Sequence, residues 1–393
     1  MSLPNITFII HDQIGGVAYM NHQIIQYSNL IDHFHVRIIL FKKKEDLSPV
    51  FGEKFKAHEI EKFNYSEFDN YYLVLNRFNK VINKISGIIV SNDGIEMHSI
   101  KLFGTQSIIY AIVHDFYNLK LAFHNYGLIN VFICHTEVYS RALKSSGTKS
   151  PRIDFLPHGV VISPPQEIKR EEKENCLQII FIGRFVASKG VTLLYEIDKK
   201  LKERNVKVSW KIIGTGELEN EVKNQWKESE NVFFCSPHQN DEIIKIALQS
   251  DIFISPSVFE GYGISLLEGM ACSLVPIVYN LPIGIASLIK KDTGFVIEQD
   301  ESIDAFVNAI ETLGNDHFLL SEMKANAYQF VSKNYNILET SKKYLNSFLD
   351  TKELSPIIQG KKIKSFSFFD KRFIPNSLSA QMKRSVRWIR KKN

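Results

Sequence analysis

The stretch FEGYGISLLEGM, residues 259–270, combines two glutamates with closely spaced glycines. Glu260 precedes the glycines, and Glu268 follows about one turn into an apolar segment that has the pattern of a helix. Carboxylates accept hydrogen bonds from sugar or ribose hydroxyls, and the N–H groups at a helix start favour a phosphate. The alternative is a surface loop before an ordinary helix whose early acids complement the helix dipole. Three further residues of the stretch are candidates for ligand contact: Gly261, Gly263 and Ile264.

A second candidate is the basic turn GRFVASKG, residues 183–190, which follows an apolar run. Gly183 permits the turn, while Arg184 and Lys189 place two cations near the start of the next helix. Two cations beside exposed helix N–H groups favour a diphosphate ligand. The GxxxxGK[ST] pattern of a P-loop is absent, and the alternative is a solvated basic turn.

Two glycine pairs also follow predicted strands. Gly15 and Gly16 precede the apolar-periodic stretch 17–30, where they let the backbone approach an anion, or simply form a tight turn. Gly214 and Gly216 form the first half of a dinucleotide fingerprint that lacks its third glycine. An NAD site is therefore not expected there, and a turn that lines a nucleotide pocket remains open.

Apolar β-branched runs alternate with segments of helix length along most of the chain, which predicts parallel sheets covered by helices on both faces. The predicted strands are residues 6–11, 36–41, 87–90, 107–113 and 130–135, then 177–183, 208–214, 231–234, 251–255, 275–280 and 294–297. A Pro-rich and then highly charged segment separates the two groups. We therefore expect two doubly wound α/β domains, with a ligand at the carboxyl ends of the strands, in a deep cleft between the domains.

The domain boundaries follow from this pattern. The expected organisation is a first domain over 1–162, a linker over 163–176, a second domain over 177–335, a helix that packs back over 336–360, and a tail over 361–393.

Composition excludes several classes of protein. Of the 393 residues, 44% are hydrophobic and 23% charged, as in ordinary soluble globular proteins. The four cysteines are far apart, which argues against a zinc site or a disulfide framework and fits a reducing compartment. The N-terminus has the pattern of a strand and not of a signal peptide, and no apolar run is long enough to span a membrane.

No DxD triplet follows a strand, and SNDGIE at 91–96 is a poor substitute, so no metal site is expected.

The C-terminal tail carries most of the positive charge. From Lys361 onward, eleven Lys and Arg face one acid, which gives +10 and leaves −5 of the total +5 for residues 1–360. Residues 377–392 place apolar side chains at helical spacing between basic ones, the pattern of an amphipathic helix on an anionic membrane. A solvated or docked helix is one alternative and nucleic acid is another, although nothing in the body of the chain indicates base recognition.

In combination, these residues resemble the retaining glycosyltransferases of family 4, which have the GT-B fold of two Rossmann-like domains. The most specific match is SPSVFEGYGISLLEGMA, and the resemblance covers roughly residues 1–335. The matching features, in chain order, are Gly15-Gly16, His114-Asp115, Gly183-Arg184 with Lys189-Gly190, and Glu260 with Glu268. The chain departs from the family pattern in CSLVPIV and in LPIGIASLI, and these departures leave the nucleotide base of the donor open.

The resemblance implies a role for each of these residues. Arg184 and Lys189 would hold the donor diphosphate and neutralise the leaving nucleotide. Glu268 would bind the ribose hydroxyls, and Glu260 the hydroxyls of the transferred sugar. His114, at the end of a predicted strand, would face the sugar and help to stabilise the reacting centre, unless His114-Asp115 is only a polar strand end with a helix cap.

The resemblance also implies an activity. The first loop, with Gly15-Gly16, would close on the phosphates, the first domain would bind the acceptor and the second the nucleotide sugar. The expected protein is a cytoplasmic, metal-independent retaining hexosyltransferase, peripheral on the inner face of the membrane, that needs no cofactor. Its donor would be a UDP-sugar or GDP-sugar, and its acceptor a glycan or lipid-linked glycan of a surface polysaccharide or lipopolysaccharide. A sugar-nucleotide epimerase, a phosphorylase or a non-catalytic partner of another transferase are the alternatives.

Overall fold

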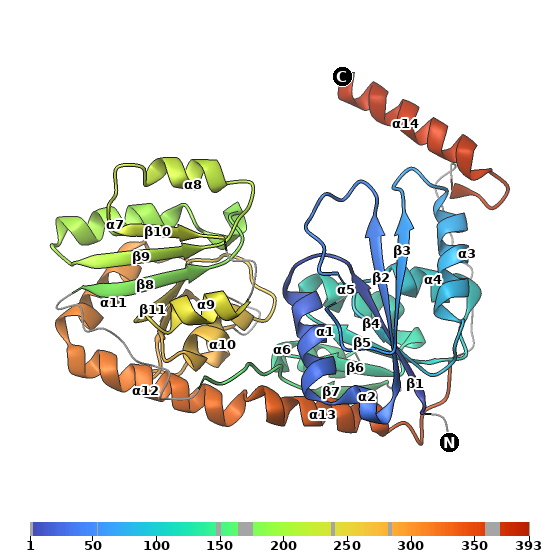
Figure 1. The fold of residues 1–393 in the computed structure, drawn as a ribbon, viewed down its shortest axis with the longest axis horizontal. Coiled ribbons are helices and arrows are strands. Elements are labelled where there is room, and N and C mark those ends of the chain that lie inside the picture. The colour runs from blue at the N-terminus through green and yellow to red at the C-terminus, as the bar shows by residue number, and fades with distance from the viewer. Residues whose placement is uncertain are drawn as a thin grey trace. The chain divides into compact units, whose positions relative to one another are not determined.

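The computed structural model describes residues 3–52, 54–146, 151–163, 176–236, 240–281, 285–357 and 370–392. The chain divides into two compact units, one made of Met1–Pro157 with Ser341–Asn393 and the other of His158–Thr340 (Figure 1). Most of the predicted linker, 164–175, and the first part of the predicted tail, 361–369, lie outside the described residues.

The first unit, here called the N-terminal unit, contains a seven-stranded parallel sheet in the order β3-β2-β1-β4-β5-β6-β7. Its strands are β1 (Asn5–His11), β2 (His35–Lys43), β3 (Glu59–Tyr65), β4 (Ile88–Ser91), β5 (Ile108–Val113), β6 (Val131–Cys134) and β7 (Arg152–Phe155). Its helices up to β7 are α1 (Gly16–Tyr27), α2 (Leu30–His33), α3 (Tyr71–Ile82), α4 (Ile95–Phe103), α5 (Phe116–Asn125), the 3-10 turn η1 (Tyr126–Leu128) and α6 (Glu137–Lys144).

Two strands of this sheet, β3 and β7, were not predicted, and both lie at its edges. Edge strands bury fewer side chains than central ones, so their sequences, EIEKFNY and RIDF, lack a continuous apolar run. The acids of β3 instead serve a buried cation. Arg37 on β2 is 1% exposed, lies 3.5 Å from Glu59 and pairs with Glu61.

The second unit, here called the C-terminal unit, contains a six-stranded parallel sheet in the order β10-β9-β8-β11-β12-β13. Its strands are β8 (Leu177–Ile182), β9 (Val208–Ile213), β10 (Val232–Cys235), β11 (Ile252–Ser255), β12 (Val275–Tyr279) and β13 (Phe295–Ile297). Its helices are η3 (Ala187–Lys189), α7 (Leu193–Glu203), α8 (Glu219–Gln225), α9 (Asn240–Ala247), α10 (Ile264–Ala271), η4 (Ile285–Leu288), α11 (Asp304–Asn315) and α12 (His317–Asn334). The predicted pair of doubly wound parallel sheets is confirmed.

Two helices complete the chain. From Ser341 onward, α13 (Ile337–Leu349) belongs to the N-terminal unit, where Tyr344 and Phe348 join the hydrophobic core. The ring of Phe348 packs edge-on against Phe8 of β1, at 5.9 Å between centroids. The tail helix α14 (Asn376–Lys392) also belongs to this unit. Over the described parts of the chain, every helix is too short or too polar to cross a bilayer.

Candidate functional site

The strand order of each sheet identifies where a ligand is expected. In the C-terminal unit the chain runs outward from β8 through β9 to β10 and then returns to β11 on the other side of β8. The loops after β8 and β11 therefore diverge at a topological switch point, where open α/β sheets bind ligands. Of the two most informative sequence motifs, 183–190 occupies the first of these loops, and 259–270 begins in the second and continues into helix α10. In the N-terminal unit the equivalent point lies between β1 and β4.

The two motif loops of the C-terminal unit lock together through their backbones. The N–H of Val258 donates to the carbonyl of Ser188 at 3.0 Å. Gly190 has a φ of +64°, and a Cβ there would lie 2.1 Å from the carbonyl oxygen of Pro256. Only glycine fits this position, because both the backbone conformation and the close approach exclude a side chain.

The central contact of the site joins the two motifs. The ammonium of Lys189 lies 2.6 Å from a carboxylate oxygen of Glu260, and the two side chains are only 18% and 12% exposed. Sequence alone did not pair these residues, because it assigned them to different parts of a ligand. A largely buried ion pair keeps both charges at fixed positions, so the loops after β8 and β11 present one ordered polar pair.

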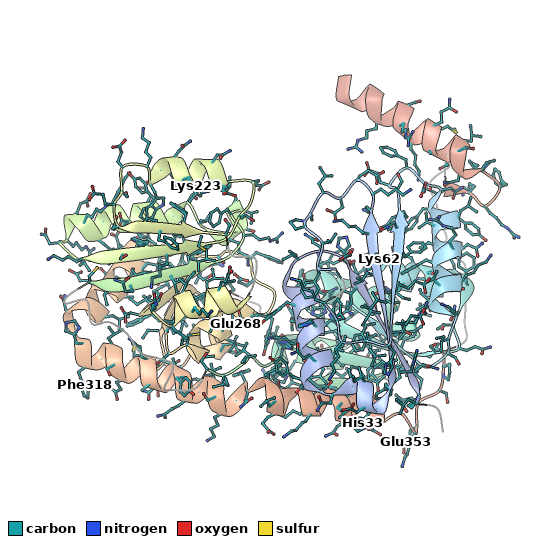
Figure 2. All side chains as sticks on the ribbon, in the orientation of Figure 1. His33, Lys62, Lys223, Glu268, Phe318 and Glu353 are labelled. Carbon is teal, nitrogen blue, oxygen red and sulfur yellow. The ribbon has the colours of Figure 1, made fainter. Side chains whose placement is uncertain are left out.

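Helix α10 begins four residues after Glu260. Gly263, which precedes its first residue, adopts the left-handed region with a φ of +85°. The N–H groups of the first turn have no partner within the helix and can face an anion. Glu268 is the fifth residue of α10 and is 8% exposed (Figure 2). Tyr262 anchors the preceding loop, since its hydroxyl donates to the carbonyl of His158 at 2.9 Å.

The remaining predicted residues of this unit differ in their surroundings. Arg184 is exposed, whereas Gly261 and Ile264 are half-buried. A Cβ on Gly214 would lie 1.9 Å from the carbonyl oxygen of Gly183. A Cβ on Gly216 would come similarly close to the backbone of the same β8 loop. The packing of two loops thus already requires both glycines, and their contact with a nucleotide stays a prediction.

In the N-terminal unit, the Gly15-Gly16 pair directly follows the β1 loop and starts α1. Gly15 has an extended backbone, with a φ of 173°, and a Cβ on it would have no neighbour within 4 Å. Neither conformation nor internal packing therefore requires glycine at this position. The open space beside Gly15 leaves room for a ligand to approach the backbone.

His114 directly follows β5, at the carboxyl edge of the sheet, and is 4% exposed. Its Nε2 lies 2.8 Å from Oδ1 of Asn92, an oxygen that also accepts from the side-chain amide of Asn21 at 2.9 Å. Because this oxygen can only accept, Nε2 of His114 carries the proton. Asp115 caps α5, as its carboxylate accepts from the N–H of Asn118 at 2.8 Å. The helix cap considered for Asp115 is thus present alongside the polar strand end.

Asn92 is a site residue that sequence reasoning missed. It lies in SNDGIE, whose pattern suggested only a poor substitute for a metal motif. Glu96 organises this loop: its carboxylate is fully buried and accepts from the Ser91 hydroxyl at 2.5 Å and from the N–H groups of Asn92 and Asp93, both at 3.1 Å. Burial raises the pKa of Glu96. The signal available in the sequence was a run of polar residues directly after a strand.

A second histidine lies against His114. His135 follows β6, is 1% exposed, and its ring centroid is 5.2 Å from that of His114. Burial lowers the pKa of His135 to about 4. His135 is therefore neutral near pH 7 and adds no positive charge beside His114.

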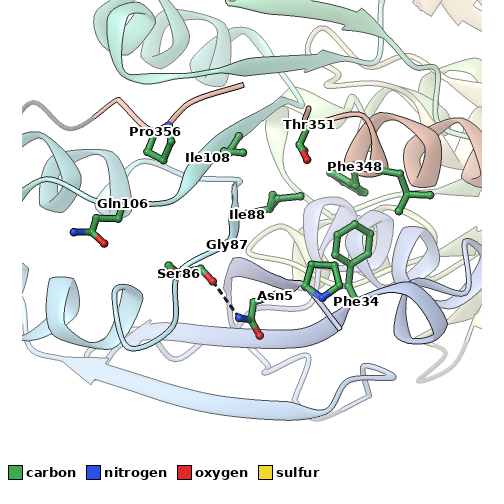
Figure 3. Close-up of a pocket in the computed structure, with 12 residues that line it drawn as sticks. Asn5, Phe34, Ser86, Gly87, Ile88, Gln106, Ile108, Phe348, Thr351 and Pro356 are labelled. Carbon is green, nitrogen blue, oxygen red and sulfur yellow. Dashed lines mark hydrogen bonds between the residues drawn. The ribbon is translucent and has the colours of Figure 1, made fainter. Parts of the chain in front are cut away.

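A pocket of about 440 Å³ lies elsewhere in the N-terminal unit, at the amino ends of β1, β4 and β5 (Figure 3). Its lining includes Asn5, Phe34 and Phe348, and none of the described residues that line it is charged. It is at the opposite edge of the sheet from His114, where doubly wound folds do not place their ligands. We therefore do not assign the candidate site to it. Within the described ranges, no three His, Cys, Asp or Glu side chains converge as metal ligands would.

Comparison with known families identifies the C-terminal unit. Residues 164–330 match the family model for Glycosyl transferases group 1. The matched segment contains both motif loops and helix α10.

Curated relatives point the same way. The UDP-Gal:alpha-D-GlcNAc-diphosphoundecaprenol alpha-1,3-galactosyltransferase of Escherichia coli is 28% identical over 234 residues, which cover 56% of this chain and 59% of the relative. The capsular polysaccharide biosynthesis glycosyltransferase CapM of Staphylococcus aureus is 28% identical over 47% of this chain and 51% of its own. The chain thus spans between half and three fifths of these relatives. The O-antigen biosynthesis glycosyltransferase WbnH of Escherichia coli is 26% identical over 85% of this chain and 97% of its own.

Solved structures establish the fold. Anabaena Alr3699/HepE in complex with UDP and glucose superposes with a TM-score of 0.70 at 16% identity, covering 88% of this chain and 99% of its own. The lipopolysaccharide outer core galactosyltransferase WaaB gives a TM-score of 0.67 at 15% identity, with 88% and 99% covered. The two parallel-sheet units have the fold of the GT-B glycosyltransferases.

Proposed function

We propose that this chain is a retaining, metal-independent glycosyltransferase of family 4 that transfers a sugar from a UDP-sugar or GDP-sugar to a hydroxyl of a glycan or lipid-linked acceptor. The observation that carries the proposal is the Lys189–Glu260 ion pair at the switch point of the C-terminal unit, inside the segment that matches the glycosyltransferase family. A cation for the diphosphate and an acceptor for sugar hydroxyls are the two groups that binding a nucleotide sugar requires.

The charges that develop during sugar transfer are complementary to the charged groups near this pair. As the bond to the diphosphate breaks, the anomeric carbon of the sugar becomes positive and the leaving group becomes more negative. Lys189, the exposed Arg184 and the N–H groups of α10 would stabilise the leaving group. Groups that are already positioned for such a developing charge contribute strongly, and loss of one typically costs about 10²–10³ in rate.

The other roles follow the family resemblance. Glu268 would bind the ribose, Glu260 would orient the transferred sugar, and His114 would help to stabilise the reacting centre. The acceptor hydroxyl would attack on the face that the diphosphate leaves, which retains the configuration at the anomeric carbon. No cofactor is part of this proposal.

We further propose a lipid-linked acceptor and a peripheral position on the cytoplasmic face of the membrane. The name of one relative specifies a diphosphoundecaprenol-linked substrate for that protein, and the tail helix α14 carries six basic residues and no acid. In the structure, Arg384 and Arg387 lie over the ring of Phe68, at 5.4 and 5.5 Å. These two arginines therefore hold the helix on the N-terminal unit, and changing them would confound a membrane test.

A cleaner test of the tail changes the basic residues that follow these two arginines. Replacing Arg390, Lys391 and Lys392 with glutamine should move the full-length protein from the membrane fraction toward the soluble fraction, because anionic lipids attract each basic residue. An unchanged distribution would show that the end of the tail is not a membrane anchor.

The proposed activity is tested with purified full-length protein and a panel of UDP, GDP and their sugars in the presence of EDTA. The true donor at 100 times its dissociation constant should stabilise the protein by about 2.7 kcal/mol in thermal unfolding. The product formed with a lipid-linked acceptor should keep the anomeric configuration of the donor by NMR. Formation of an epimerised nucleotide sugar, or no response to any nucleotide sugar, would contradict the proposal.

A further inference from the structure

The connection between β2 and β3 departs from the pattern of the fold. The two strands are parallel neighbours, yet the described residues of the connection, 44–52 and 54–58, contain no helix. Phe51 and Phe55 fix the second half of this crossover loop, because both are buried and pack around the ring of His22 on α1, at 5.7 and 5.9 Å. The first half of the loop is left at the surface.

The exposed half displays apolar side chains. Leu47 is 93% exposed and Val50 is 53% exposed. Ile14, in the neighbouring β1 loop, is 54% exposed, and its N–H donates to the carbonyl of Pro49 at 2.8 Å. Ile14, Leu47 and Val50 thus lie on two loops held together by their backbones, and we call these three residues the apolar tip.

Basic residues adjoin the apolar tip. Lys43 and Lys44 lie at the junction of β2 and the crossover loop, separated from Leu47 by two acids, and both are exposed. The two acids that follow them, Glu45 and Asp46, accept hydrogen bonds from backbone N–H groups. The carboxylate of Glu45 accepts from the N–H of Glu67 at 2.9 Å, and that of Asp46 accepts a hydrogen bond from within its own loop, also at 2.9 Å. Both carboxylates keep their charge, so Lys43 and Lys44 are balanced by Glu45 and Asp46, and the loop itself is apolar with mixed charges. The net positive charge comes from the tail helix α14, which carries six basic residues and no acid.

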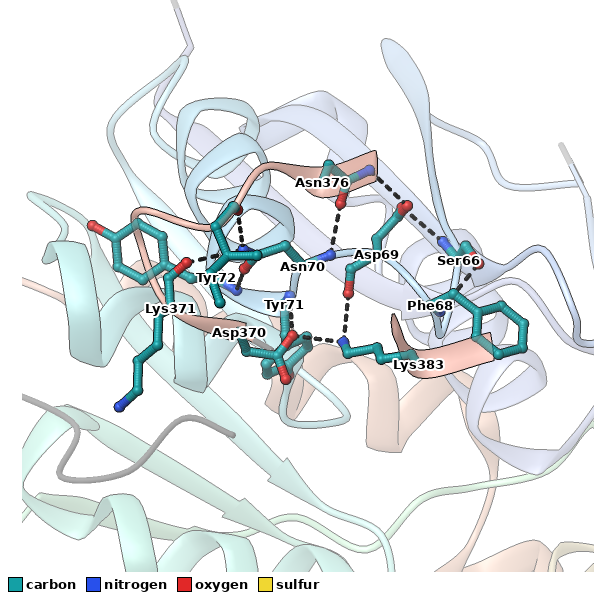
Figure 4. A network of polar contacts seen from close by, with 11 residues as sticks. Ser66, Phe68, Asp69, Asn70, Tyr71, Tyr72, Asp370, Lys371, Asn376 and Lys383 are labelled. Carbon is teal, nitrogen blue, oxygen red and sulfur yellow. Dashed lines mark hydrogen bonds and ion pairs between the residues drawn. The ribbon is translucent and has the colours of Figure 1, made fainter. Parts of the chain in front are cut away.

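The tail helix docks on the next loop of the same edge (Figure 4). Lys383 of α14 lies 2.6 Å from the carboxylate of Asp370 and donates to the carbonyl of Asp69 at 2.7 Å. The side-chain amide of Asn70, which is fully buried, donates to the carbonyl of Ile374 at 2.7 Å. These contacts fix the start of the helix to the β3–α3 loop.

One residue links the two surfaces. Glu67, whose N–H binds Glu45 of the crossover loop, also pairs through its carboxylate with Arg387 of α14. The crossover loop, the β3–α3 loop and the tail helix are therefore connected neighbours at the carboxyl edge of the sheet. The lysines of the loop therefore belong to the same side of the N-terminal unit as Lys383 and Arg387 of the tail helix.

We propose that the apolar tip, with Lys43 and Lys44, is a membrane-binding surface that inserts into an anionic lipid bilayer beside the docked tail. The proposal deepens the proposed function, since it rests on an acceptor held in a membrane. An exposed leucine on the same side as lysines and a basic helix fits a bilayer, because the apolar side chain enters the acyl region while cationic groups meet lipid phosphates. Three apolar side chains are too few for the core of a specific protein interface, which buries about 800 Å² per partner.

The test is sedimentation of the full-length protein with vesicles of phosphatidylcholine alone or mixed with phosphatidylglycerol. Leu47→Asp should lower the partition coefficient on the mixed vesicles by about tenfold or more, because a carboxylate replaces an inserting side chain. Replacing both Lys43 and Lys44 with glutamine should lower it by roughly fivefold for each lysine, and mainly on the anionic vesicles. A matched control is Phe318→Asp in the C-terminal unit, which removes a side chain that is 79% exposed on α12.

The outcomes separate this inference from the proposed function. Leu47→Asp should keep the nucleotide-sugar stabilisation of the parent protein, since its side chain faces solvent. Vesicle binding of Leu47→Asp equal to that of the parent, or an equal loss for Phe318→Asp, would overturn the membrane surface whether or not a donor binds. If no nucleotide sugar stabilises the protein while vesicle binding still depends on Leu47, the proposed function alone would be overturned.

Discussion

The ammonium nitrogen of Lys189 lies 2.6 Å from a carboxylate oxygen of Glu260, and the pair joins the loops that follow β8 and β11. Each residue limits the position of the other, since both side chains are largely buried. In the proposed roles, Lys189 contacts the diphosphate and Glu260 contacts the sugar. The ion pair then positions both side chains at once. The two residues should then act as one unit and not as independent contributors.

Lys189→Gln and Glu260→Gln should each lower kcat/KM for the donor by about 10²–10³, and the double variant should lose far less than the product of the two effects. Lys189→Gln should weaken the binding of the free nucleoside diphosphate, UDP or GDP. Glu260→Gln should mainly remove the additional affinity of the nucleotide sugar over that diphosphate. Steady-state kinetics and calorimetry measure both effects.

A matched control for this pair is the surface ion pair of Lys199 with Glu196, at 3.3 Å, where both side chains are about half exposed. Lys199→Gln should leave turnover unchanged, because exposed ion pairs contribute little. Fully additive effects of Lys189→Gln and Glu260→Gln would show that the pair is not a functional unit.

Asn92→Ala should lower kcat by roughly tenfold to a hundredfold without changing the dissociation constant of the nucleoside diphosphate. The reason is that the Asn92 oxygen accepts the Nε2 proton of His114, so its loss frees the imidazole to rotate or to change tautomer. If His114 has its proposed role, Asn92 is a positioning residue. Asn130→Ala is the control, because Asn130 is also a buried amide but binds the backbone at Ile109 and Ser355. It should lower stability and spare kcat, and equal losses of kcat in both variants would count against the role of Asn92.

The sequence was sufficient to predict the central strands and hence the loops that carry the candidate residues. Runs such as LQIIFIG and DIFIS are apolar because β8 and β11 are covered on both faces, so periodicity identifies them directly. The carboxyl ends of parallel strands lie at one edge of a sheet, so the strand pattern by itself predicts that Arg184 and Glu260 lie in loops at the same edge. The edge strands β3 and β7 bury too little to give such a signal.

The contacts within the site could not be predicted in the same way. The Lys189–Glu260 pair depends on the conformation of two loops that are distant in sequence. The role of Asn92 depends on a buried amide network that draws on α1, β1 and the end of β5. The polar side chains of the site follow no regular spacing in the sequence, because the position of each depends on its own tertiary partner. For Gly214, the pattern suggested a ligand contact, whereas the structure supplies an internal packing reason.

Two glycine substitutions separate folding from ligand binding. Gly15→Ala should leave the free energy of unfolding nearly unchanged, since Gly15 is extended and has open space where a Cβ would lie. If the proposed role of Gly15 is correct, the same change should weaken nucleotide-sugar binding. Gly214→Ala should instead destabilise the protein by more than about 1 kcal/mol, because Gly214 has a φ of +147° and packs on the Gly183 carbonyl. Chemical denaturation and calorimetry measure the two effects, and normal donor affinity in Gly15→Ala would argue against a backbone contact there.

His135 should make the protein sensitive to acid in a defined range. Its pKa is lowered from 6.5 to about 4 by burial, so between these values the unfolded chain binds a proton that the folded chain excludes. Stability from this residue is therefore complete above pH 6.5 and falls as the pH drops toward 4, by roughly 3 kcal/mol in all. His135→Gln should flatten the decline in the free energy of unfolding over this range. His124→Gln, which changes an exposed histidine on α5, should follow the parent, and a parallel slope for His135→Gln would show that other groups set the acid sensitivity.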